Sequence, residues 1–155
     1  MARISDNFSI KGNVHIQVWN EKGELTADYD AGHNTVTDVG DAWVANQLSG
    51  AAADLMSHMG VGTSASGGDD TALTDLVTPY GPRVVLTSTT QGVGAADNDI
   101  IYVASFTSIA ATITEAGIFN DAAAGTMGFY NDSLSQLLTS GDTLQITWTV
   151  TFGAS

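Results

Sequence analysis

The sequence predicts a mainly β protein: a single antiparallel β-sandwich of jelly-roll type with one α-helix around residues 37–49. Two observations predict the sandwich. Stretches in which apolar and polar residues alternate recur along the chain, and residues that favour turns separate them. The helix is predicted because one stretch places its apolar residues at helical spacing instead. A chain of 155 residues is long enough to bury a core, and we expect one domain over residues 13–155.

The first alternating stretch predicts a β-hairpin. Val14, Ile16 and Val18 alternate with polar residues, residues 21–24 (Glu-Lys-Gly-Glu) form a turn, and residues 25–29 return. Further strands are expected at residues 55–61, 83–90, 100–107, 112–119, 126–131 and 143–152.

The last expected strand has two different faces, because successive side chains of a strand point to opposite sides. Its apolar row, with Trp148 at the centre, is expected to face the sandwich interior. The opposite row carries no charge although the chain is acidic. Two interpretations stay open for this row, a solvated sheet surface or a contact with a neighbouring subunit. The residues of the candidate subunit interface are Gln145, Thr147, Thr149 and Thr151.

The predicted helix has recognisable start signals. Thr37 is a suitable N-cap, and Asp38 and Asp41 fall in the first turn, where the helix dipole favours acids. Gly40 lowers the stability of the helix by about 1 kcal/mol relative to alanine, so packing against the rest of the protein has to hold this helix. A shorter helical turn is expected over residues 71–76. The apolar residues that we expect to pack are Val39, Trp43, Val44 and Leu48.

The charge balance limits the classes of partner. Seventeen Asp and Glu against four Lys and Arg give a formal net charge of -13, which repels phosphate groups, so neither nucleic acid nor a membrane is an expected partner. The acids are read as a solubilising coat, with attraction to a basic partner or calcium held between subunits as alternatives. No apolar run has the length of a signal peptide or a membrane span, so synthesis in a cytoplasm is expected.

Catalytic patterns are not recognised in the sequence, and no enzyme activity is expected. The chain has no cysteine, and His15, His33 and His58 have no zinc-site spacing. Residues 60–65 fit a loose dinucleotide-binding pattern, but the glycines and acids after them cannot open the helix that such a site requires. Residues 96–99 lack the length and terminal Glu of a calcium-binding loop, as do Asp69 and Asp70, so they are read as turns. We expect no cofactor and no metal site.

Four segments in order carry a family resemblance: MGVGTSASGGDDTALTDLV, RVVLTSTTQGVGAADNDIIYVASF, ITEAGIFNDAAAGTMGFY and SGDTLQITWTVTF. Across residues 34–152 the chain resembles tailed-bacteriophage structural proteins that serve as capsid decoration (cement) proteins or head-fibre subunits. The resemblance implies a jelly-roll-like sandwich on the capsid exterior that binds the major capsid protein at capsomer junctions and stabilises the head. We expect a homotrimer. A tail-fibre, tail-tip or baseplate-associated domain is the alternative, and a carbohydrate-binding module is a third.

Residues 1–12 are expected to form an N-terminal arm that contacts the capsid. This segment holds two of the four basic residues and three apolar anchors, and an arm that adds a strand to a neighbour's sheet is a common mode of recognition. Alternatively, Phe8 and Ile10 belong to the first strand of the sandwich, and both interpretations can hold together. The candidate arm contacts are Arg3, Ile4, Phe8, Ile10 and Lys11.

Overall fold

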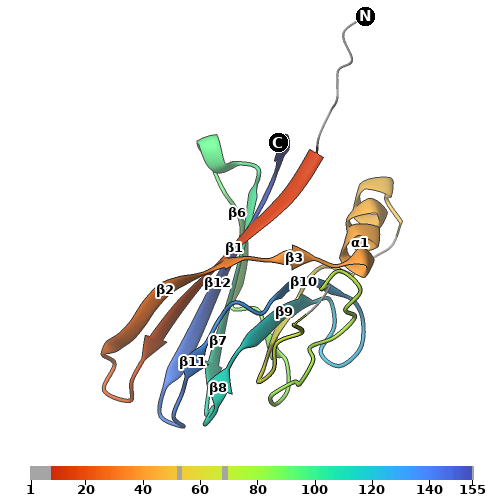
Figure 1. The fold of residues 1–155 in the computed structure, drawn as a ribbon. Helices are drawn as coiled ribbons and strands as arrows, with labels where there is room; N and C mark the ends of the chain where they lie inside the picture. Colours follow the sequence, from red (N-terminus) through yellow and green to blue (C-terminus); the bar gives the residue numbers. More distant parts are fainter. Residues whose placement is uncertain (1–7, 52–53, 68–69, 155) are drawn as a thin grey trace, which may run out of the picture.

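The computed structural model describes residues 8–51, 54–67 and 70–154, and it confirms a mainly β fold with antiparallel sheets packed as a sandwich (Figure 1). Sheet A has the strand order β2 (Leu25–His33), β1 (Phe8–Trp19), β12 (Thr143–Ala154), β7 (Asp99–Thr107) and β6 (Ser88–Gln91). Sheet B has the order β3 (Thr35–Val36), β10 (Met127–Asn131), β9 (Glu115–Phe119), β4 (His58–Gly62) and β5 (Val84–Val85). A small third sheet pairs β11 (Gln136–Leu137) with β8 (Thr112–Ile113).

The two longest strands lie at the middle of sheet A. β1 and β12 pair along their whole length, from Phe8 opposite Ala154 to Trp19 opposite Thr143. The predicted hairpin between β1 and β2 is confirmed, with Gly23 at φ 78° in its turn. Beyond sheet B, the far ends of β1, β12, β7 and β6 continue on one side of the molecule, where β1 begins and β12 ends (Figure 1).

The core lies between the inner face of sheet A and sheet B. As expected, the apolar row of the last strand faces inward: Trp148 has no exposed surface, and its indole Nε1 donates to Asn34 Oδ1 at 3.1 Å. Strands β9 and β10 are buried along their whole length. The segment before β5 covers their second face, where Leu76 packs in a separate apolar cluster with Phe119, Met127 and Tyr130.

The helix α1 (Asp38–Ser49) begins and ends close to its predicted bounds. Thr37 Oγ1 accepts a hydrogen bond from Gly40 N at 3.0 Å as the N-cap, and Gly50 ends the helix in the left-handed conformation. The expected packing is only partly found, because Gly40 is the buried residue of the helix and Leu48 is 81% exposed. Among the described residues no helix has the length and apolar character to cross a membrane.

Two expected strands are each divided because the chain changes partner within them. Leu86 N donates to Ser57 O, beside sheet B, and Thr87 N donates to Val103 O in sheet A, so residues 83–90 form β5 and then β6. Similarly, residues 112–119 form β8, which pairs with β11, and then β9 in sheet B. The expected helical turn at residues 71–76 is wrong: these residues form turns and bends, and a 3-10 turn lies instead at Gly94–Ala96.

Candidate interaction surfaces

The four residues of the candidate subunit interface lie in one row on the outer face of sheet A. Gln145, Thr147, Thr149 and Thr151 are half-buried on the central strand β12. The structure adds neighbours on both sides that could not be assigned from the sequence, because strand pairing joins distant segments. The sheet A platform, as we call it, consists of the four residues with Asn13 and Gln17 on β1 and Ile101, Val103 and Ser105 on β7.

Hydrogen bonds within the sheet A platform are few. Gln145 Nε2 donates to Gln17 Oε1 at 3.4 Å. At the far end of the row, Thr151 Oγ1 donates to Asp99 Oδ1 at 2.6 Å. Elsewhere the row presents hydroxyl groups between half-buried Ile101 and Val103 on one side and Asn13 and His15 on the other. The row itself can form hydrogen bonds to a flat neighbour without removing a charge of its own from water.

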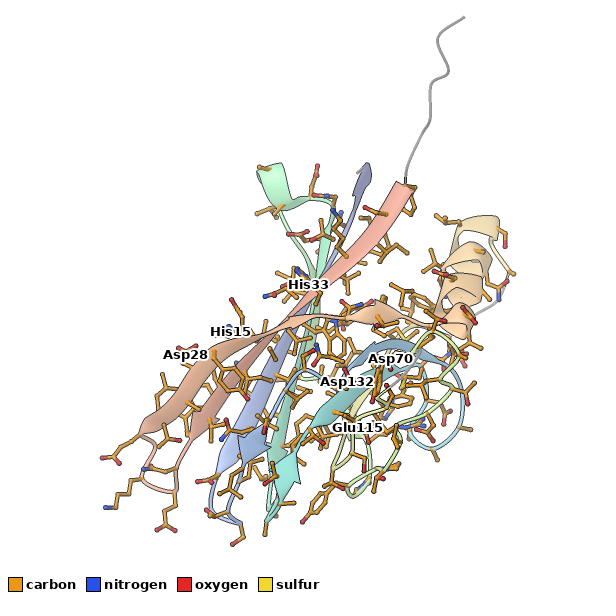
Figure 2. The ribbon with its side chains drawn as sticks, viewed as in Figure 1. His15, Asp28, His33, Asp70, Glu115 and Asp132 are labelled. Carbon is orange, nitrogen blue, oxygen red and sulfur yellow. The ribbon has the colours of Figure 1, made fainter. Side chains whose placement is uncertain are left out.

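A histidine between two carboxylates lies beside the middle of the sheet A platform, between Asn13 and Gln17 of β1 (Figure 2 labels His15 and Asp28). His15 on β1 lies opposite Thr147, with its Nε2 2.6 Å from Asp28 Oδ1 and its Nδ1 2.7 Å from Asp30 Oδ1. The hydrogen bond to Asp30 and the contacts with Asp28 raise the pKa of His15, and the same contact lowers the pKa of Asp30. Both ring nitrogens can donate only in the imidazolium form, so this arrangement favours a protonated histidine.

The candidate arm is only partly within the described residues. Arg3 and Ile4 lie outside them. Phe8, Ile10 and Lys11 belong to β1 and pair with β12, so these three residues are part of the first strand of the sandwich. No break in the structure marks the expected boundary between residues 12 and 13. Phe8 is nevertheless 65% exposed, with its ring centroid 6.3 Å from that of Phe152.

The glutamate of the ITEAGIFND segment has a structural role. Glu115 is fully buried in β9 (Figure 2), and its carboxylate accepts hydrogen bonds from Val77 N at 2.9 Å, Thr78 N at 2.7 Å and Tyr130 Oη at 2.9 Å. Burial raises the pKa of Tyr130, and the hydrogen bond to Glu115 raises it further. A Cβ at Gly62 would stand 2.3 Å from Glu115 Oε1, so the MGVG segment needs glycine there. These contacts hold the segment before β5 on sheet B.

The small-residue loop after Phe119 is held by Arg83. The guanidinium carbon lies 3.5 Å from the centroid of the buried Phe119 ring. Its Nη1 donates to Asp121 O at 3.0 Å and to Ala124 O at 2.6 Å, and Nη2 lies 3.2 Å from Asp75 Oδ1. One of the four basic residues therefore fixes a loop instead of serving as a free surface charge.

No protein-family model, curated protein or solved structure matches the chain.

An apolar groove lies between α1 and the far end of sheet A, and we call it the helix groove. It encloses a cavity of about 370 Å³. The sequence does not indicate this groove because its two walls are distant in the chain. α1 contributes Trp43, Val44 and Leu48, sheet A contributes Ile100, Tyr102 and Phe152, and the segment before β4 adds Leu55 and Met56.

The remaining polar residues with functional potential have local partners. His33 Nδ1 lies 3.2 Å from Gly12 O, and His58 Nδ1 lies 2.8 Å from Ser57 Oγ, so both histidines are hydrogen-bonded. The Ser66 hydroxyl contacts both Asp70 and Asp132 (Figure 2). Asp69 lies outside the described residues. Across residues 8–51, 54–67 and 70–154, no group of three or more His, Cys, Asp or Glu is arranged to hold a metal ion.

Proposed function

We propose that the chain is a structural subunit of a tailed-bacteriophage particle that decorates the capsid exterior as a homotrimer. In this role it binds the major capsid protein at capsomer junctions and reinforces the head, without catalysis. The ordered motifs that resemble decoration proteins support this proposal. The chain passes between the two sheets at both edges, from β2 into β3 and from β5 into β6, and this connection also suits a rigid module that resists deformation.

The observation that carries the proposal is the uncharged central row of the sheet A platform. The chain has a net charge of -13, yet the row from Gln145 to Thr151, on the central strand of sheet A, contains no charged residue. Charged groups are depleted at the centres of protein interfaces relative to the rest of the surface. A platform of hydroxyl and amide groups therefore fits contact with a neighbouring subunit or with the capsid, where many copies compensate for modest affinity at one site.

Particles that lack the protein test this function. We expect them to infect normally but to release DNA on heating or osmotic shock, and added protein should restore their resistance. Particles that stay stable but fail to adsorb to cells would instead indicate a tail-fibre or tail-tip role.

A charge variant of the sheet A platform sharpens the test. Protein carrying Thr147→Lys and Thr149→Lys should lose the ability to restore resistance. A matched variant, Thr74→Lys with Thr112→Lys, adds the same charge at exposed threonines outside the platform and should act like the wild type. Equal restoration by both variants would contradict a role of the platform.

We expect residues 1–7 to supply the part of the arm that contacts the capsid. Deleting residues 1–11 would remove four residues that pair with β12, so the deletion should end at residue 7. We expect this shorter deletion to lower capsid occupancy and to leave the melting temperature unchanged. Full occupancy would exclude Arg3 and Ile4 as capsid contacts.

A further inference from the structure

Large apolar side chains are exposed to solvent at the rim of the helix groove. Leu48 is 81% exposed and Leu55 is 70% exposed, although both line the groove. Half-buried Trp43 adds its ring to the same wall, with its Nε1 donating to Asp54 O at 2.7 Å. Single exposed apolar residues are ordinary, but several around one apolar hollow indicate an interaction site. A protein segment that inserted its own apolar side chains would remove this surface from water.

The charges around the helix groove have one sign. Its lining comes from α1, residues 54–57, β6, β7 and β12, and these stretches contain no lysine or arginine. They carry Asp38 and Asp41 on α1 and Asp54 beside Leu55. Basic side chains placed at the rim of the groove would therefore be attracted, and acidic ones repelled.

The floor of the helix groove is neutral. Tyr102 lines it, and burial raises the pKa of this tyrosine to about 12, so its hydroxyl stays protonated at physiological pH. The cavity of about 370 Å³ falls at the small end of the range of about 300–1,000 Å³ for cavities that hold ligands. It is suited to a few anchoring side chains of a larger partner.

We propose that the helix groove binds a peptide segment of a partner protein, with apolar anchors for the cavity and Lys or Arg residues on either side of them. Binding would follow the common mode in which apolar side chains at helical spacing enter a groove. The proposal is independent of capsid decoration, because it concerns a surface separate from the sheet A platform.

The test uses the full chain and two synthetic peptides. The first has Leu and Phe at i, i+3, i+4 and i+7 with Lys residues at both ends, and the second has Glu in place of each Lys. Fluorescence anisotropy of labelled peptide measures binding. We expect the Lys peptide to bind about tenfold or more tightly than the Glu peptide at low salt, with the difference reduced at high salt.

Matched variants place the binding in the helix groove. Leu48→Gln with Leu55→Gln should weaken binding of the Lys peptide about tenfold, since buried apolar anchors dominate such interfaces. Leu25→Gln with Leu137→Gln alters two exposed leucines on β2 and β11 and should leave the affinity unchanged. Both variants replace exposed residues, and circular dichroism checks that they fold.

Several results would overturn the proposal: the Lys peptide does not bind, the two peptides bind equally, or the groove variant and its control lose the same affinity for the Lys peptide. Phosphatidylcholine vesicles are tested in the same way. If the groove variant loses binding to the vesicles but keeps binding to the Lys peptide, the groove binds lipid instead of a peptide.

Discussion

Gly40 on α1 lies directly against Gly128 on β10. A Cβ at Gly40 would stand 2.3 Å from Gly128 O, closer than any ordinary contact, so this helix approaches the sheet only because residue 40 lacks a side chain. Thr37, the N-cap, also donates through Oγ1 to Met127 O at 2.5 Å. The first turn of the helix is thereby fixed to β10, and the last turn extends beyond the sandwich (Figure 1).

Replacing Gly40 by alanine should destabilise the protein although alanine favours helices. The gain of about 1 kcal/mol in helix propensity is smaller than the cost of moving α1 away from β10, and we expect a net loss of about 1–3 kcal/mol. Urea unfolding measures the change. The control is Gly153→Ala, where an added Cβ meets only Asn98 Nδ2 at 3.6 Å. A stabilised Gly40→Ala variant would contradict the close approach of the two backbones.

Replacing Glu115 by glutamine should lower the free energy of unfolding by about 3 kcal/mol, because an amide cannot accept all three hydrogen bonds in the buried site. Tyr130→Phe removes one donor and should cost less, about 1 kcal/mol. Glu21→Gln, at an exposed position in the hairpin turn, serves as the control. Chemical denaturation of the three variants ranks them. Equal stability of Glu115→Gln and Glu21→Gln would show that the carboxylate does not hold the segment before β5.

The contacts of His15 with Asp28 and Asp30 should stabilise the protein most at mildly acidic pH. The folded pKa of His15 is raised, so its contribution is complete below the unfolded value of 6.5 and disappears as pH rises through the folded value. Asp30 has a lowered folded pKa, so its contribution is present above 3.8 and disappears as pH falls through the folded value. The stabilising window lies between these two limits.

Thermal unfolding of wild type and His15→Gln at several pH values measures this window. The difference in melting temperature should be largest near pH 5 and small above pH 8. Asp142→Asn, at a carboxylate with no histidine partner in the described residues, controls for a general effect of charge on a chain of net charge -13. A constant difference across pH would contradict a protonated His15.

The sheet A platform should govern the oligomeric state. If wild-type protein forms the expected trimer in analytical ultracentrifugation, Thr147→Lys with Thr149→Lys should shift it to monomer. Lysines on the platform would have to lose their hydration at the subunit contact, which opposes assembly. Thr74→Lys with Thr112→Lys should leave the trimer unchanged. A trimer that persists in both variants would place the platform in water.

Local patterns in the sequence determined several features of this protein. Alternation fixed the inward row of β12 with Trp148, and capping residues fixed the bounds of α1, because these depend on residues close together in the chain. The uncharged row from Gln145 to Thr151 was likewise recognisable from one strand.

Only the tertiary structure decided how distant segments meet. Strand pairing placed His15 between Asp28 and Asp30 and widened one uncharged row into the sheet A platform. The approach of Gly40 to Gly128 set the position of α1, which left Leu48 exposed and opened the helix groove towards Phe152. Helical spacing identifies an apolar stripe, but it cannot say whether a partner element within the same chain is near enough to cover it. That depends on backbone distances between elements, which a close contact of two glycines controls here.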